Sequence, residues 1–143
     1  MSASLVGSEM CIRDRYRLDY LLIGKNSLGY QFVFVEFEDV NVEYKLKTEN
    51  SESNKVRKGL SQIRDWKRWI NQNINYFLNA DGIKEFSSNV FPWGFRYALV
   101  VGRRDNMDET SNQLRGELQR EVDVTIMSYD RLVDYVALLH NGI

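Results

Sequence analysis

The chain of 143 residues contains one cysteine, one proline and one histidine, and no apolar run approaches the roughly 20 residues that span a bilayer. The cysteine, Cys11, has no partner for a disulfide, which fits a reducing cytoplasm as the expected location. The net charge of −1 excludes a uniformly basic surface, so affinity for nucleic acid must come from a local patch. We find no glycine-rich phosphate loop, no Ser/His/Asp arrangement and no internal repeat, and the lone His140 is expected in solvent.

The composition, with 43% hydrophobic, 13% aromatic and 27% charged residues, is that of a globular protein with one core. Its first part is unusual. Residues 1–15, which include Cys11, resemble a translated sequencing adapter, and we expect them to be non-native, the alternative being a genuine frayed terminus. We therefore expect the folded domain at residues 16–143, as a fragment of a protein that begins further upstream, so that the fold is truncated at its N-terminal side.

The strongest pattern lies at Tyr30–Asp39, where aromatic and β-branched residues end in carboxylates. This pattern predicts a largely buried strand. Side chains alternate along a strand, so Glu36 and Glu38 continue the apolar face of Phe32 and Phe34. Carboxylates on such a face are costly to bury unless they are hydrogen-bonded or hold a metal. The alternative is that the strand leaves the core and the acids meet water.

A second strand is predicted just before the first, at Tyr16–Ile23, and the turn signal between them predicts a β-hairpin. A loop of this length sets Asp19 across from a position between Phe34 and Glu36. Cross-strand neighbours lie about 4.5–8 Å apart, so Asp19 and Glu36 can converge on one small ion. Arg17 is the other possible partner for Asp19.

A basic helix is predicted over Lys55–Ile70, with six basic residues against one acidic residue. Its core stripe is expected to comprise Val56, Leu60, Ile63 and Ile70. Beside that stripe, a second face carries Lys58, Gln62, Trp66 and Trp69. From charge alone, the basic side of this helix is equally consistent with solvent exposure and with contact to phosphates.

The remaining elements are predicted from periodicity and turn signals. In chain order they are a polar loop at Val40–Asn54 with a short strand at Val42–Leu46, a short helix around Tyr76–Leu78, a break at Asp81–Gly82, a turn at Val90–Gly94 around the only proline, a strand at Phe95–Val101, a helix at Asp108–Arg120, a short strand at Val122–Met127, and a helix at Asp130–His140 capped by Ser128. In this order, strands alternate with helices.

This order of elements resembles the PD-(D/E)xK nuclease superfamily and, more closely, the Shedu antiphage nuclease domain. The matching motifs, which extend over nearly everything after Tyr16, are Arg17-Leu-Asp-Tyr-Leu-Leu22, Val33-Phe-Val-Glu-Phe-Glu38, Gly59-Leu-Ser-Gln-Ile-Arg-Asp-Trp-Lys-Arg-Trp69, Ala98-Leu-Val-Val-Gly-Arg-Arg104 and Ser128-Tyr-Asp-Arg-Leu132. The resemblance implies an α/β (α+β) fold with a restriction-endonuclease-like mixed sheet flanked by helices, and a metal-dependent endonuclease that hydrolyses DNA in prokaryotic antiphage defence.

Residue by residue, the resemblance implies that Asp19 and Glu36 bind Mg²⁺ or Mn²⁺, that Gln62 is an auxiliary catalytic residue, and that Trp66 is the aromatic paired with it. Hard cations of this kind prefer oxygen ligands. The position that is usually lysine is Glu38 here, which is then a ligand or a general base. Lys47 or Lys58 is a candidate for the missing cation.

DNA is the expected partner, through Lys55, Lys58, Arg64 and Trp66, with a homo-oligomer as a further possibility and no membrane partner. Two alternatives stay open. One is a nucleic-acid-binding or assembly module that keeps the fold without cleavage. The other is an interaction domain in which Trp66, Trp69 and the last helix pack against another protein.

Overall fold

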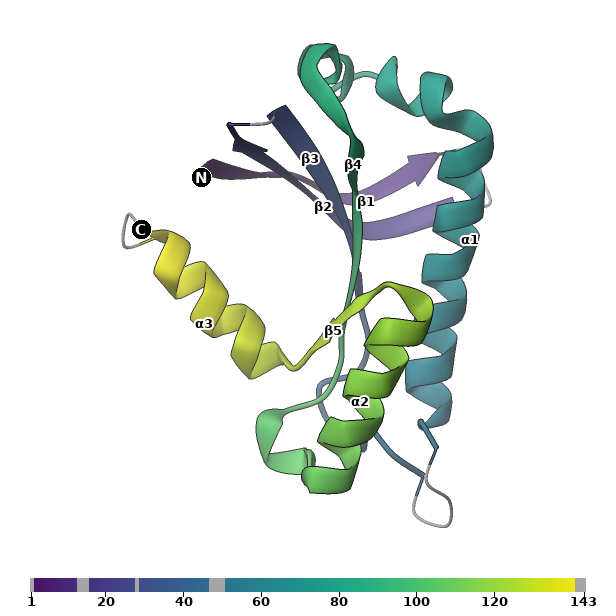
Figure 1. Ribbon diagram of the computed structural model, residues 1–143, viewed down its shortest axis with the longest axis vertical. Coiled ribbons are helices and arrows are strands. Elements are labelled where there is room, and N and C mark those ends of the chain that lie inside the picture. The colour runs from purple at the N-terminus through teal and green to yellow at the C-terminus, as the bar shows by residue number, and fades with distance from the viewer. Residues whose placement is uncertain (1, 13–15, 28, 47–50, 141–143) are drawn as a thin grey trace.

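The computed structural model describes residues 2–12, 16–27, 29–46 and 51–140. These residues form one five-stranded sheet flanked by helices (Figure 1). The elements, in chain order, are β1 (Ser2–Ile12), β2 (Tyr16–Asn26), β3 (Gly29–Phe37), α1 (Asn54–Leu78), η1 (Lys84–Asn89), β4 (Val90–Val100), η2 (Arg104–Asn106), α2 (Glu109–Val122), β5 (Thr125–Met127) and α3 (Tyr129–His140).

The sheet is mixed, with strand order β1-β2-β3-β4-β5. Strands β1, β2 and β3 are antiparallel, whereas β3, β4 and β5 are parallel and are joined by crossovers through α1 and α2. Figure 1 shows α1 and α2 on one side of the sheet and α3 on the other. The α/β fold class is thus confirmed, and the arrangement fits that of a restriction endonuclease. No helix in the described part of the chain is long and apolar enough to cross a membrane.

The main core lies between the sheet and α1, on the face of β3 that carries Phe32 and Phe34. Phe34 packs on Trp66 with ring centroids 5.7 Å apart and on Phe77 at 5.4 Å. The predicted stripe of α1 is buried, and α2 closes the same core with Leu114, Leu118 and Val122. On the other face of the sheet a smaller cluster joins Val35 to the start of α3. The two faces of β3 therefore belong to two separate apolar clusters.

The pairing register of β2 and β3 positions the carboxylates of Asp19 and Glu36. Tyr20 pairs with Val35 and Leu21 with Phe34, so the residue before Tyr20 reaches the level of Glu36. The predicted placement of Asp19 is confirmed. The turn is tighter than expected, because β2 continues to Asn26 and β3 already begins at Gly29, whose φ of 127° suits a glycine.

The segment that we predicted to be non-native contributes a strand to the sheet. Residues Ser2–Ile12 form β1, which pairs with β2 in antiparallel fashion, for example Leu5 with Leu22. Residues 1 and 13–15 of this segment lie outside the described residues. Ladder hydrogen bonds use backbone groups that every non-proline residue carries, so this pairing needs no particular side chains.

Helix α1 is longer than predicted and absorbs the short helix expected at Tyr76–Leu78. Its two parts meet at Asn73, whose φ of −133° and ψ of 29° are not helical. The Asn73 side chain donates a hydrogen bond to the carbonyl of Trp69 at 3.0 Å. Burial of Phe77 against the sheet explains why the helix continues past this kink.

The predicted turn at Val90–Gly94 is wrong, because these residues belong to β4. Tyr30 pairs with Val90 whereas Phe32 pairs with Phe95, so β4 carries extra residues in a bulge around the proline. A bulge tolerates proline because it leaves some backbone N–H groups out of the ladder.

Two short strands are also smaller than predicted. The strand expected at Val42–Leu46 reduces to a single bridge between Lys45 and Glu52, and β5 covers only Thr125–Met127.

Candidate active site

Asp19 and Glu36 lie side by side at the end of the β2–β3 hairpin. Beyond the last ladder pair, Asp19 Oδ2 accepts a hydrogen bond of 2.8 Å from the backbone N–H of Phe37. This bond fixes the Asp19 carboxyl against the end of β3. The Asp19 and Glu36 carboxyl groups are themselves within hydrogen-bonding contact. The structure therefore brings together the two residues that we predicted as metal ligands.

The Glu36 carboxyl is buried, with 2% of the residue exposed. Its pKa is raised from 4.5 to about 8, first by burial and then by the charge of Asp19, the hydrogen bond with Asp19 and the charge of Glu38. A hydrogen bond with the Trp66 side chain acts in the opposite direction. At neutral pH, without a cation, Glu36 therefore holds a proton in the folded chain.

The pair has the chemistry of a site for a hard divalent cation. Glu36 Oε1 is buried and has no hydrogen-bond partner among the described residues. A buried oxygen without a partner costs about 1–3 kcal/mol, and a cation bound beside Asp19 would remove that cost. Mg²⁺ is bound by one or two carboxylates together with water and phosphate. The described residues hold no group of three or more His, Cys, Asp or Glu side chains that suits a metal, so the candidate site consists of two carboxylates.

Glu38 continues the same face of the strand and is also buried, at 9% exposed. Its backbone N–H donates to the carbonyl of Val100 at 2.9 Å, which holds the end of β3 beside β4. Burial raises the pKa of Glu38, and the positive charges of Lys58 and then Lys55 oppose this rise. Both ammonium groups therefore lie within electrostatic reach of Glu38. Lys47, the other candidate for the missing cation, lies outside the described residues, as does the side chain of Arg17.

Helix α1 approaches the carboxylates at Gly59. A Cβ atom on Gly59 would lie 3.1 Å from Glu38 Cγ and 2.5 Å from Leu99 Cδ1, so only glycine permits this close packing. Gln62 follows Gly59 by three positions and precedes Trp66 by four, which places the three residues on one face of the helix. Gln62 is exposed on this face, which overlies the carboxylates.

Trp66 is buried, whereas the sequence analysis also expected it to contact nucleic acid. It is 2% exposed, packs against Phe34, and its side chain hydrogen-bonds Glu36. Contact with nucleic acid does not fit this burial, and we assign Trp66 to positioning the Glu36 carboxyl. Trp69 is also buried, at 6% exposed, so the two tryptophans do not form the protein-docking surface considered above.

The basic residues of α1 do not form one surface. Lys55, Lys58 and Arg64 are all exposed. However, Arg64 is nine residues after Lys55, about half a turn around the helix, and so points away from the carboxylates. Three other basic side chains have partners elsewhere, namely Arg57 with Glu52, Lys67 with the carbonyl of Val122, and Arg68 with Asp65. The cations beside the site are therefore Lys55 and Lys58.

Sequence reasoning missed Tyr129 at the start of α3. Its hydroxyl donates a hydrogen bond to the backbone carbonyl of Glu38, and its ring stacks on Phe37 with centroids 5.9 Å apart. Burial, followed by the charges of Asp19 and Glu38, raises the pKa of Tyr129. The partners are 91 residues apart, so no local pattern signals this contact. By contrast, the close packing at Gly59 had a local signal that we did not use, namely a glycine within a predicted helix.

A comparison with family models supports the predicted resemblance. The model described as "Shedu protein SduA, C-terminal" matches residues 3–133, which is most of the chain. A search of curated proteins found no match. The matched range contains Asp19, Glu36, Glu38 and Gln62 and also most of β1.

Proposed function

The chain belongs to the family of the C-terminal region of the Shedu protein SduA, and on this basis we propose that it is a metal-dependent endonuclease domain that hydrolyses DNA phosphodiester bonds. Membership of this family supports a role in antiphage defence. The nuclease activity, the metal dependence and the placement in the PD-(D/E)xK superfamily are our proposals.

One observation carries the proposal. Two carboxyl groups, Asp19 and Glu36, meet at the end of a buried strand, and one Glu36 oxygen has no partner among the described residues. A strongly raised pKa beside a second carboxyl, next to exposed lysines, marks a candidate functional site. A divalent cation bound by this pair would activate water and stabilise the charge that develops on the phosphodiester.

The residues around the carboxylate pair have the remaining catalytic and binding roles in this proposal. Glu38 is the general base, because it follows Glu36 on the same face of the strand and burial raises the pKa of its carboxyl, which makes it a better proton acceptor. Lys58 offsets the negative charge near Glu38 and takes the place of the family's usual lysine. Gln62, exposed on the same face of α1, orients water or substrate. Lys55 contacts a phosphate.

The test is cleavage of supercoiled plasmid with Mg²⁺ or Mn²⁺. We expect nicking by the wild-type chain and none by Glu36→Gln or Asp19→Asn. Glu85→Gln is the matched control, because Glu85 is exposed on η1, and η1 packs at the start of β3 through Phe86 and Tyr30. The control variant should cleave like the wild type.

A thermal unfolding series with the same cations tests binding separately from turnover. A ligand that binds only the folded state stabilises it by RT ln(1 + [L]/Kd), about 2.7 kcal/mol at a hundredfold excess over Kd. The stabilisation should be present in the wild type and absent in Glu36→Gln. A folded wild type that binds DNA but shows neither cleavage nor a metal-dependent shift would instead support the alternative, a nucleic-acid-binding or assembly module without cleavage.

A further inference from the structure

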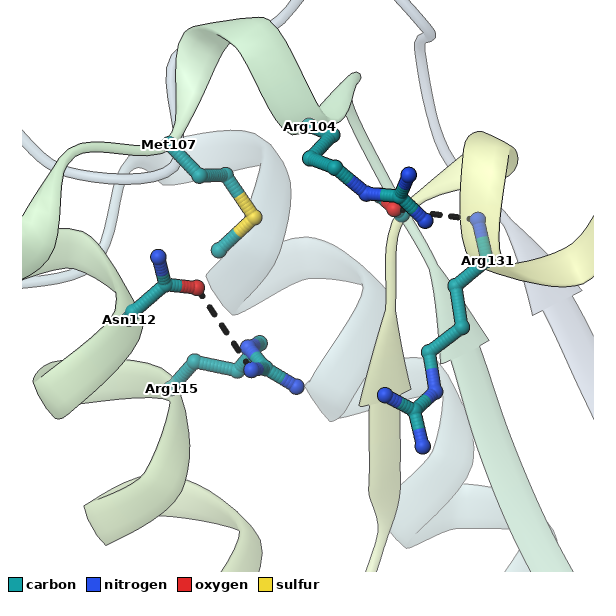
Figure 2. Close-up of a pocket in the computed structure, with 6 residues that line it drawn as sticks. Arg104, Met107, Asn112, Arg115 and Arg131 are labelled. Atoms are coloured by element: carbon teal, nitrogen blue, oxygen red, sulfur yellow. Dashed lines mark hydrogen bonds between the residues drawn. The ribbon is translucent and has the colours of Figure 1, made fainter.

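A pocket rich in arginine lies at the end of the molecule where α2, β5 and α3 meet. It is lined by Arg104, Met107, Asn112, Arg115, Ser128 and Arg131, which we call the arginine pocket. Figure 2 shows Asn112 and Arg115 on one side of it, from α2, and Arg131 on the other, from α3. Its volume is about 80 Å³. A single water needs about 10–15 Å³ of such volume, so there is room for a group of several heavy atoms.

The charge of the pocket is unbalanced. Three of the lining side chains are cationic and none is acidic. The nearby carboxylates are engaged with Arg104, since Asp134 pairs with its guanidinium at 2.8 Å and Asp130 accepts from its backbone N–H at 2.7 Å. Arg115 and Arg131 make no ion pair with any described residue. The surplus positive charge therefore comes from these two arginines.

The donors of the pocket are only partly used. The Arg115 guanidinium donates to the carbonyl of Ile126 at 3.1 Å and lies 3.5 Å from Asn112 Oδ1. Its Nε–H is buried and has no acceptor among the described residues. Ser128, which is 7% exposed, accepts a hydrogen bond from the backbone of Arg131 and keeps its own O–H proton to donate. Unpaired donors of this kind require an acceptor, and an anion with several oxygens would satisfy them together.

The pocket shares an edge of the sheet with the carboxylates. Strands β3, β4 and β5 are parallel, so their C-terminal ends lie at the same edge. Glu36 is the penultimate residue of β3, Arg104 follows β4, and Ser128 follows β5. Tyr129, the neighbour of Ser128, donates its hydroxyl hydrogen bond to the Glu38 carbonyl. In open α/β sheets, ligands bind outside this edge.

We propose that the arginine pocket binds a phosphate group. A tetrahedral oxyanion suits guanidinium forks and a serine hydroxyl, and arginine binds phosphate in bidentate fashion. The assignment of this group to the DNA backbone, flanking the phosphate that is cleaved, rests on the proposed function. The existence of the anion site does not, because none of the lining residues belongs to the carboxylate pair.

The test uses the full chain and two probes, inorganic phosphate and a labelled DNA duplex without divalent cation, so that no cleavage takes place. The variant is Arg131→Gln, since this side chain is exposed and its loss leaves the core intact. Arg120→Gln is the matched control, because Arg120 is exposed on α2 outside the pocket and carries the same charge. Arg115→Gln is a second pocket variant.

Phosphate should raise the unfolding temperature of the wild type and of Arg120→Gln but not of Arg131→Gln. For the duplex, loss of one phosphate contact reduces the slope of log K against log salt by about 0.9, which lowers affinity on the order of tenfold at 0.1 M salt. Both effects together support the pocket as a site for a backbone phosphate. A phosphate effect without a change in DNA affinity supports the anion site and assigns it to free phosphate or a small phosphate ester.

The proposal is overturned if the wild type, both pocket variants and the control respond alike to phosphate and to DNA. This failure is distinct from failure of the proposed function. If the arginine pocket proves not to bind phosphate, cleavage that depends on Glu36 can still be observed. Conversely, if the chain proves not to cleave DNA, a stabilisation by phosphate that is lost in Arg131→Gln still supports the anion site.

Discussion

Gly59 of α1 and Glu38, directly after β3, are packed so closely that a Cβ on Gly59 would lie 3.1 Å from Glu38 Cγ, and 2.5 Å from a methyl carbon of Leu99. Glycine in a helix normally costs about 1 kcal/mol relative to alanine. In α1 this cost is offset by the approach of the helix to the sheet, which brings Lys58 and Trp66 to the carboxylates.

Gly59→Ala should therefore destabilise the chain, although alanine is the better helix former. Overpacking typically costs about 1–3 kcal/mol, and the helix would have to move away from β3. Urea unfolding measures the change. The matched control is Gly116→Ala in the middle of α2, where a Cβ has nothing within 4 Å among the described residues. That substitution should raise stability by about 0.5–1 kcal/mol. Equal gains at both glycines would contradict the close packing of α1.

Removal of the hydroxyl group should have opposite effects on stability at two tyrosines. Tyr129→Phe deletes the hydrogen bond to the Glu38 carbonyl and should lower stability by about 1 kcal/mol. The hydroxyl of Tyr44 is buried and has no partner among the described residues, so Tyr44→Phe should raise stability by about 1 kcal/mol. Urea unfolding of both variants provides the comparison, and a loss at Tyr44 as large as that at Tyr129 would contradict it.

The stability of the metal-free chain should fall as pH rises through the titration of Glu36. Its pKa is about 8 in the folded chain against an ordinary value of 4.5. Between these values the folded state binds more protons than the unfolded state, so the free energy of unfolding decreases with pH. Below this pH range the Glu36 carboxyl is protonated in both the folded and the unfolded state, and above it the carboxyl is ionised in both. Glu36→Gln has no such proton and should lack this part of the decline.

The measurement is urea unfolding from pH 4.5 to 8.5 in the presence of a chelator. Glu38 has a raised pKa as well, so the quantity to compare is the difference between wild type and Glu36→Gln at each pH. Glu85→Gln should follow the wild-type curve throughout. Added Mg²⁺ or Mn²⁺ should make the wild-type decline shallower, because a cation stabilises the ionised carboxylate. Parallel curves for wild type and Glu36→Gln would show that Glu36 titrates normally.

Lys58 should influence the pH at which Glu38 acts. Its charge lowers the pKa of Glu38, so Lys58→Gln should raise this pKa and move the acidic limb of the cleavage rate profile to higher pH. Arg64→Gln removes the same charge from the opposite side of α1 and should leave the limb in place. A purely structural role for Lys58 predicts a lower rate at every pH without a shift, which the same profile would reveal.

Much of the fold follows from local periodicity. The alternation along β3 predicted which side chains share a face of the sheet, because successive residues of a strand point to opposite faces. The turn signal limited the position opposite Asp19 to the range from Phe34 to Glu36, and the structure sets Asp19 at the level of Glu36. The helix stripe with Val56 and Ile63 was likewise correct. The mistakes lie where tertiary packing overrides a local signal, as at the proline bulge of β4 and the continuation of α1 to Phe77.

The sequence by itself determined the β2–β3 hairpin with its two carboxylates and the basic helix α1, because each depends on residues that are close in the chain. Only the tertiary structure decided that Trp66 points inward to Glu36, that Lys58 rather than Arg64 faces the acids, and that Tyr129 supports the Glu38 backbone. The tertiary structure also brought together the lining residues of the arginine pocket, which come from η2, α2, α3 and the segments next to them. These contacts join segments far apart in the sequence, and they depend on how α1 and the crossovers pack against the sheet.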